Sequence, residues 1–108
     1  MGAKANIIID QGTDYSTTLT VKNDDGTATD LTGYTASGQM RKHYSSANAT
    51  ATFAISFDSN RTTGLLTVEL AKSVTNNITA GRYVYDVEIT SSGDKTTRLV
   101  EGIATVTP

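Results

Sequence analysis

The chain has 108 residues, a net charge of −2 and no cysteine. This length suits one domain, and the lack of cysteine excludes disulfides, zinc–thiolate sites and thiol nucleophiles. Acidic and basic residues are mixed without a basic stripe, which argues against nucleic-acid binding. No apolar run is long enough to span a membrane. We therefore expect one domain, residues 1–108, with neither nucleic acid nor membrane as a partner.

Seven segments are expected to be β-strands, and most of them have the period-two alternation that is typical of strands. They are residues 5–10, 15–22, 33–42, 50–57, 64–70, 80–90 and 96–107. The first contains three consecutive isoleucines, so either both of its faces are covered or it twists at a sheet edge. Threonine is frequent, and this β-branched residue favours strands. Leu31, in the polar connection before the third strand, is expected to lie under the edge of the fold.

The third strand places Tyr34, Ala36, Gly38 and Met40 on one face. Its two small residues leave room in a core, and we expect a tyrosine from residues 80–90 to fill it. The fourth and fifth strands, 50–57 and 64–70, are expected to form an antiparallel hairpin. A short helical segment is expected within residues 71–77.

Residues 80–90 are the clearest strand, with Tyr83, Tyr85, Val87 and Ile89 on one face. Gly81 stands two residues before Tyr83, a spacing typical of the tyrosine corner of immunoglobulin-like sandwiches. In the final strand Gly102 is expected to mark a bulge. Together these features predict an all-β fold, an immunoglobulin-like antiparallel β-sandwich of about seven strands, with one short helical turn before the sixth strand.

Few residues of this chain are candidates for catalysis, metal binding or partner binding. His43 is the only histidine, and no nucleophile motif accompanies it. The acidic segment 23–26 with Asp30 has two readings, a calcium site or a hairpin turn, and we favour the turn because the spacing of calcium-binding loops is missing. We expect no catalytic, cofactor-binding or metal-binding residues and no cofactor. The candidate interaction surface is Arg41, His43 and Tyr44, since Tyr44 is the one tyrosine outside the predicted core positions.

Three segments together resemble a known family. They are Leu31-Thr32-Gly33-Tyr34 running on to Gln39-Met40-Arg41-Lys42-His43-Tyr44, then Ala80-Gly81-Arg82-Tyr83-Val84-Tyr85-Asp86-Val87-Glu88, and finally Arg98-Leu99-Val100-Glu101-Gly102-Ile103-Ala104-Thr105-Val106-Thr107-Pro108. The chain resembles short virion structural proteins of tailed bacteriophages, especially myophages of marine cyanobacteria. It is more distantly similar to the N-terminal domains of phage baseplate upper proteins.

The resemblance implies a non-enzymatic virion component that acts through protein–protein contacts, as a decoration, baseplate, neck or fibre-attachment protein. The implied partners are other virion proteins and further copies of the chain as a homo-oligomer. The implied location is the virion, assembled in the bacterial host cytoplasm. The terminal strands, 5–10 and 96–107, are the candidates for strand addition at an exposed edge.

Two alternatives stay open. The first is a carbohydrate or host-surface binding module, which requires Tyr44 and a second tyrosine on one open face. The second is a hydrolase, which requires His43 within hydrogen-bond reach of a carboxylate and a hydroxyl inside a cleft.

Overall fold

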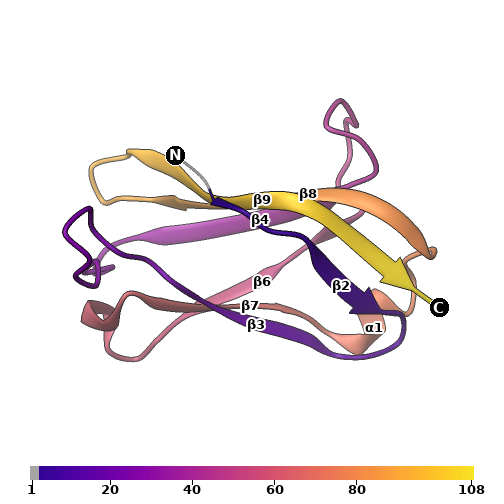
Figure 1. Ribbon diagram of the computed structural model, residues 1–108, viewed down its shortest axis with the longest axis horizontal. Helices are drawn as coiled ribbons and strands as arrows, with labels where there is room; N and C mark the ends of the chain where they lie inside the picture. The colour runs from indigo at the N-terminus through magenta and orange to yellow at the C-terminus, as the bar shows by residue number, and fades with distance from the viewer. Residues whose placement is uncertain (1–2) are drawn as a thin grey trace.

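A computed structural model describes residues 3–108, which form two packed β-sheets (Figure 1). The larger sheet has the order β1-β9-β8-β4-β5, with β2 also paired to β9, and the smaller has the order β3-β7-β6. The strands are β1 (Ala3–Lys4), β2 (Ile7–Asp10), β3 (Tyr15–Thr20), β4 (Thr35–Arg41), β5 (Ala51–Thr52), β6 (Ala54–Phe57), β7 (Leu65–Leu70), β8 (Gly81–Thr90) and β9 (Thr96–Thr107). A 3-10 turn, η1 (Arg61–Thr63), precedes β7, and the helix α1 (Lys72–Thr75) precedes β8.

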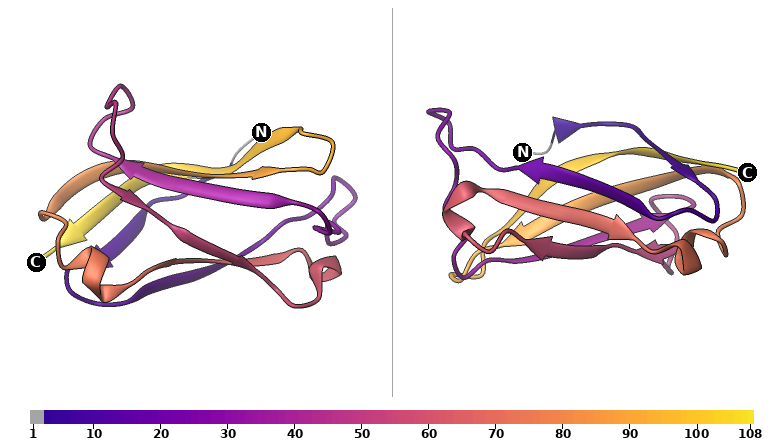
Figure 2. Two further views of the ribbon diagram at one scale, coloured as in Figure 1. Left: turned by 180° about the vertical axis from the view of Figure 1, so that it is seen from behind. Right: turned by 90° about the horizontal axis from the view of Figure 1, so that it is seen from below.

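The predicted fold class is confirmed: the protein is an immunoglobulin-like β-sandwich, and the expected short helical turn is α1, directly before β8, the sixth of the predicted strands. β8 lies at the centre of the larger sheet, antiparallel to β9 on one side and to β4 on the other. β3, β7 and β6 form the opposite layer, as the two further views in Figure 2 show. The pairing is not antiparallel throughout, because β1 and β2 run parallel to β9. No helix among residues 3–108 is long and apolar enough to cross a membrane.

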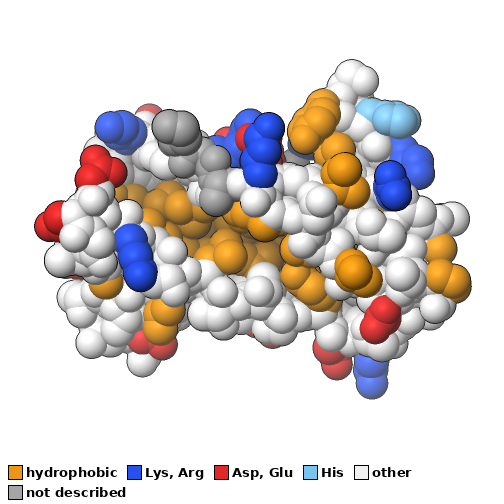
Figure 3. Space-filling model, viewed as in Figure 1, with side chains coloured by type: hydrophobic (Ala, Val, Ile, Leu, Met, Phe, Trp, Pro, Cys, Tyr) orange, Lys and Arg blue, Asp and Glu red, His pale blue; other side chains and the backbone are white. Residues whose placement is uncertain are grey.

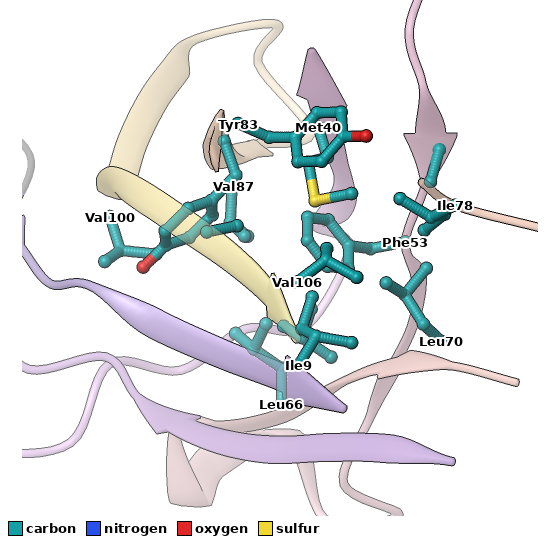
Figure 4. Packing of buried hydrophobic residues seen from close by; sticks show 14 of the residues in the cluster. Ile9, Met40, Phe53, Leu66, Leu70, Ile78, Tyr83, Val87, Val100 and Val106 are labelled. Atoms are coloured by element: carbon teal, nitrogen blue, oxygen red, sulfur yellow. The ribbon is translucent and has the colours of Figure 1, made fainter. Parts of the chain in front are cut away.

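The predicted fourth strand crosses from one sheet to the other at Phe53. β5 pairs with β4 in the larger sheet, whereas β6 pairs with β7 in the smaller one. The Phe53 side chain enters the core at this crossing and packs edge-on against Tyr85, with ring centroids 6.1 Å apart. Figure 4 shows its ring among core side chains that include Met40 and Val106. The crossing divides the predicted fourth strand into β5 and β6. The remaining additional strand, β1, lies before the predicted first strand, of which only residues 7–10 form a strand.

The space above Gly38 is filled differently from the prediction. A Cβ atom on Gly38 would lie 3.2 Å from both Phe53 Cδ2 and Val87 Cγ2. The expectation that Tyr83 or Tyr85 fills this space is therefore wrong. Val87 is the direct cross-strand neighbour of Gly38, and the sheet crossing delivers Phe53 to the same place.

The tyrosine corner is confirmed. Tyr83 is buried, and its hydroxyl donates a 2.5 Å hydrogen bond to the carbonyl oxygen of Thr79, four residues upstream. Tyr85 is also buried, and its hydroxyl donates to the carbonyl oxygen of Ala5 at 2.6 Å. The buried hydrophobic core is Ile9, Leu31, Met40, Ala51, Phe53, Leu66, Val68, Leu70, Ile78, Tyr83, Tyr85, Val87, Ile89, Val100, Ala104 and Val106.

The expectation of a bulge at Gly102 is wrong. Gly102 stays in register opposite Tyr85, and the ladder shifts instead where Val87 pairs with Val100 and Glu88 with Arg98, so Leu99 is the extra residue. Gly102 has another role: a Cβ there would lie 2.0 Å from the carbonyl oxygen of Ala5. The glycine lets the N-terminal segment run close against β9.

The three isoleucines of the predicted first strand are covered on one face only, as expected of a strand at a sheet edge. Ile9 is fully buried, while Ile8 points outward and is 68% exposed. Leu31 is fully buried, as expected for the connection under the sheet edge. In the last strand, Leu99 packs partly against the core and Ile103 is exposed.

Candidate interaction surfaces

The predicted surface residues lie at the end of β4 and in the loop that follows it. Arg41 is the last residue of β4, and its guanidinium donates a hydrogen bond to the side-chain oxygen of Gln39. His43 and Ser46 close a turn, with the His43 N–H donating to Ser46 Oγ and the Ser46 N–H to the His43 carbonyl. The Tyr44 side chain is 70% exposed. This loop stands above the larger sheet in Figure 1.

The structure brings two of the three predicted residues together. Arg41 and Tyr44 line a shallow polar hollow of about 140 Å³, together with Val84, Asp86 and Arg98. His43 lines a neighbouring hollow instead, with Lys42, Arg82, Tyr83, Val84 and Ile103. The prediction missed the contributions of β8 and β9. Asp86 alternates with the buried Tyr85 and Val87 and so lies on the outer face, but only the strand register shows that β4 and β9 flank it.

Arg98 forms ion pairs with three acidic side chains of this face. Its guanidinium lies 3.6 Å from the Asp86 carboxylate, 3.9 Å from that of Glu88 and 3.5 Å from that of Glu101. Exposed ion pairs of this kind contribute up to about 1 kcal/mol each. One arginine therefore faces three carboxylates, which leaves this part of the sheet acidic.

An apolar groove opens between the two sheets. It has a volume of about 100 Å³ and is lined by Ala5, Ile7, Tyr15, Thr17, Leu19, Phe53, Val68, Tyr85, Val87 and Val100. These residues come mainly from β3 on one side and from β8, β9 and the N-terminal segment on the other. Figure 3 shows hydrophobic side chains at the bottom of a hollow on this face of the molecule. Burial raises the pKa of Tyr85 to about 12 and also raises the pKa of Tyr15.

The groove runs beside an unpaired strand edge. β3 pairs only with β7 among residues 3–108. Just beyond β3, the Val21 N–H donates to the Gly64 carbonyl at 2.8 Å, on the β7 side. Because backbone direction alternates along an antiparallel ladder, the odd-numbered residues of β3 bond to β7. The N–H and C=O groups of Ser16, Thr18 and Thr20 therefore point away from β7.

This edge is not the one that the sequence predicted. β9 was a candidate for strand addition, but it pairs with β8 on one side and with β1 and β2 on the other. Of the two predicted strands, β2 lies at an edge of its sheet, whereas β9 is covered from Val100 onward and only its first four residues, 96–99, have β8 as their single strand partner. No local sequence signal distinguishes β3, because its alternation is that of any half-buried strand.

The acidic segment forms the favoured hairpin turn. The Asn23 N–H donates to the Thr27 carbonyl at 2.8 Å, and Gly26 has the positive φ of 87° that the turn needs. The Asp25 carboxylate accepts bonds from the hydroxyl and the N–H of Thr27, which lower its pKa. Asp30 is held by Thr32 in the same way. Each carboxylate therefore stabilises its own turn, and residues 3–108 hold no group of three His, Asp or Glu side chains placed to bind a metal.

The conditions for the two alternatives are not met within residues 3–108. Tyr83 and Tyr85 are buried, Tyr15 and Tyr34 are half-buried, and Tyr44 is the only exposed tyrosine. No second tyrosine therefore joins Tyr44 on an open face. The His43 imidazole forms no hydrogen bond to a carboxylate or hydroxyl in this part of the chain.

Comparison with known proteins identifies no family. No protein-family model matches the chain, and no curated protein matches it significantly. Among solved structures, it is similar to the crystal structure of AggA, the major subunit of aggregative adherence fimbriae type I from Escherichia coli. The two are 12% identical, the match covers 94% of this chain and 89% of that chain, and the TM-score is 0.41. A likeness this distant carries no argument about function.

Proposed function

We propose that this protein is a non-enzymatic structural subunit of a tailed phage particle, and that it joins a neighbouring subunit by strand addition along β3. The observation that carries the proposal is the unpaired edge of β3 directly beside the apolar groove. The resemblance of three chain segments to phage virion proteins supplies the context. The position within the particle is left open among decoration, baseplate, neck and fibre-attachment roles.

The edge and the groove together suit an extended peptide. An incoming strand would exchange backbone hydrogen bonds with Ser16, Thr18 and Thr20. Its alternate side chains would point toward the groove beside Tyr15 and Leu19, because side chains of a strand alternate between faces. In this mode of recognition the backbone bonds supply affinity and the side-chain pocket supplies specificity.

The groove also limits what the partner can be. Its lining is mostly aliphatic and aromatic, and its volume of about 100 Å³ is on the scale of a side chain rather than a cofactor. The partner is therefore an extended segment of another subunit with apolar residues at alternate positions. An unpaired strand edge is otherwise a liability for aggregation, and assembly would cover it.

The location is tested by mass spectrometry of purified particles, followed by immuno-labelling. We expect the chain among the particle proteins at a fixed copy number, with label at one structural position. Its absence from particles that are purified away from host lysate would overturn the proposed location. A host protein of known abundance serves as the control for contamination.

A further inference from the structure

The second hollow beside the β4 loop is lined by three basic side chains. Its volume is about 340 Å³, and its lining is Lys42, His43, Arg82, Tyr83, Val84 and Ile103. Lys42 and His43 directly follow β4, and Arg82 is the second residue of β8. All three basic side chains are exposed. Figure 3 shows Lys or Arg side chains beside the single histidine at this end of the molecule. We call this feature the cationic hollow.

The chain segments that supply these basic side chains contain no carboxylate. Residues 41–57 and 70–85 include no Asp or Glu, but they hold Arg41, Lys42, His43, Lys72 and Arg82. This bias is opposite to the net charge of −2 of the whole chain. The three ion pairs among residues 3–108 all involve Arg98, so none of them uses Lys42, His43 or Arg82.

The carboxylates of the neighbouring strands are bound elsewhere. Asp86 on β8 and Glu101 on β9 are the acidic residues closest to the cationic hollow along these two strands, and both pair with Arg98. Asp10, which ends β2, accepts a hydrogen bond from Thr107 Oγ1 at 2.7 Å. No carboxylate of residues 3–108 lines the cationic hollow. An anion that enters it therefore meets only basic and apolar side chains and the edge of Tyr83.

The Lys42 side chain is already held at this position. Its ammonium group donates a 3.3 Å hydrogen bond to the carbonyl oxygen of Arg82, and it lies 4.8 Å from the centre of the Tyr83 ring. An ammonium group has three donors, so two are left for a ligand. A side chain that is held in place before binding loses less conformational entropy when the ligand arrives.

We propose that the cationic hollow binds a phosphate monoester through Lys42, His43 and Arg82. Donors that reach the anion from two strands and a loop suit the tetrahedral, doubly charged phosphate better than a planar, singly charged carboxylate. Val84 and Ile103 form an apolar wall, and Ile103 is 39% exposed. This wall suits the organic part of the ester. A phosphate that carries an apolar group should therefore bind more tightly than free phosphate.

The test is a titration of the ¹⁵N-labelled full chain followed by two-dimensional NMR, at constant ionic strength because salt screens exposed charges. The probes are phenyl phosphate, inorganic phosphate and benzoate. We expect saturable shifts of the amide signals of residues 42, 43 and 82–84, with a Kd for phenyl phosphate on the order of millimolar. Inorganic phosphate should bind at least about threefold more weakly, because it lacks the apolar group. Shifts that rise without saturation, or benzoate binding as tight as that of phenyl phosphate, would overturn the proposal.

Variants that remove charge locate the site. Lys42→Gln and Arg82→Gln should each weaken phenyl phosphate binding by about threefold or more, since each removes a charge-assisted hydrogen bond. The double variant, folded by circular dichroism, should show no saturable shift. Lys95→Gln, which changes an exposed lysine in the turn between β8 and β9, is the matched control and should bind like the wild type.

Unchanged phosphate binding by the folded double variant would rule out the cationic hollow as the site. The proposal does not depend on strand addition along β3, because the two surfaces share no residue. A Thr18→Pro chain should therefore bind phenyl phosphate like the wild type, and failure of either proposal is recognised independently.

Discussion

Gly102→Ala should destabilise the fold by displacing the N-terminal segment from β9. The added Cβ would lie 2.0 Å from the carbonyl oxygen and 2.8 Å from the carbonyl carbon of Ala5. Both are backbone atoms, so rotation of a side chain cannot relieve the contact. The segment around Ala5 must move away from β9.

The magnitude follows from the bonds that this movement breaks. They are the Ala5 N–H to the Glu101 carbonyl at 2.9 Å, the Tyr85 hydroxyl to the Ala5 carbonyl at 2.6 Å, and the Ile103 N–H to Asn6 Oδ1 at 3.1 Å. At about 0.5–1.5 kcal/mol each, their loss costs about 1.5–4.5 kcal/mol. The lower chain entropy of alanine in the unfolded state offsets about 0.4–1 kcal/mol of this.

Urea denaturation followed by circular dichroism measures the effect. We expect the free energy of unfolding to fall by about 1–4 kcal/mol with little change in slope. The matched control is Gly93→Ala in the turn between β8 and β9, where the nearest atom to an added Cβ is 3.8 Å away. That variant should stay within about 1 kcal/mol of the wild type. A Gly102→Ala chain as stable as the Gly93→Ala chain would refute the close approach of Ala5.

Three further predictions concern buried polar groups. Tyr83→Ala should cost about 3–5 kcal/mol and Tyr83→Phe about 0.5–1.5 kcal/mol in the same urea assay; a loss below about 1 kcal/mol for the alanine variant would contradict the tyrosine corner. Thr75 is fully buried and its hydroxyl donates to the Thr13 carbonyl at 2.7 Å, so Thr75→Val should cost about 1–3 kcal/mol, and an unchanged midpoint would count against this bond. Burial raises the pKa of Tyr85 from 10.0 to about 12, so the unfolded chain loses the Tyr85 proton at a lower pH than the folded chain does. The contribution of the protonated Tyr85 to the free energy of unfolding is therefore complete below pH 10 and declines as pH rises toward 12. Tyr85→Phe should flatten that decline in unfolding measured from pH 9 to pH 12, and an unaltered slope would contradict the assignment.

The sequence was sufficient for features that depend on local pattern. The alternation in residues 80–90 places four side chains in the core, and all four are buried. The glycine two residues before Tyr83 correctly indicated the corner. Local signals work here because strand faces and turn conformations depend on neighbours within a few residues.

Features that depend on distant contacts could not be predicted in this way. Gly102 has the sequence appearance of a bulge, but its role depends on Ala5, almost the whole chain away. Phe53 fits the alternation of one continuous strand, and only the two sets of partners, β4 and β7, reveal the change of sheet. A glycine or a phenylalanine carries no mark of which remote residue it will contact.

The candidate surfaces likewise divide into those that local sequence indicates and those that depend on distant contacts. Arg41 and Tyr44 were found from exposure and residue type, and they do share a hollow. The β3 edge was missed because an unpaired edge is a property of the whole sheet order. The three carboxylates around Arg98 could also be found only from the register that sets β8 and β9 side by side.

The central claim, strand addition along β3, is tested most directly by incorporation of a Thr18→Pro chain into particles. The Thr18 N–H points away from β7, so proline there removes no ladder hydrogen bond, and edge strands tolerate this residue. Thr18→Val is the matched control, because it keeps the N–H and the branched side chain. We predict that the valine chain is incorporated like the wild type and that the proline chain, although folded by circular dichroism, is lost from particles. Incorporation of the folded Thr18→Pro chain at the wild-type level would contradict strand addition at this edge.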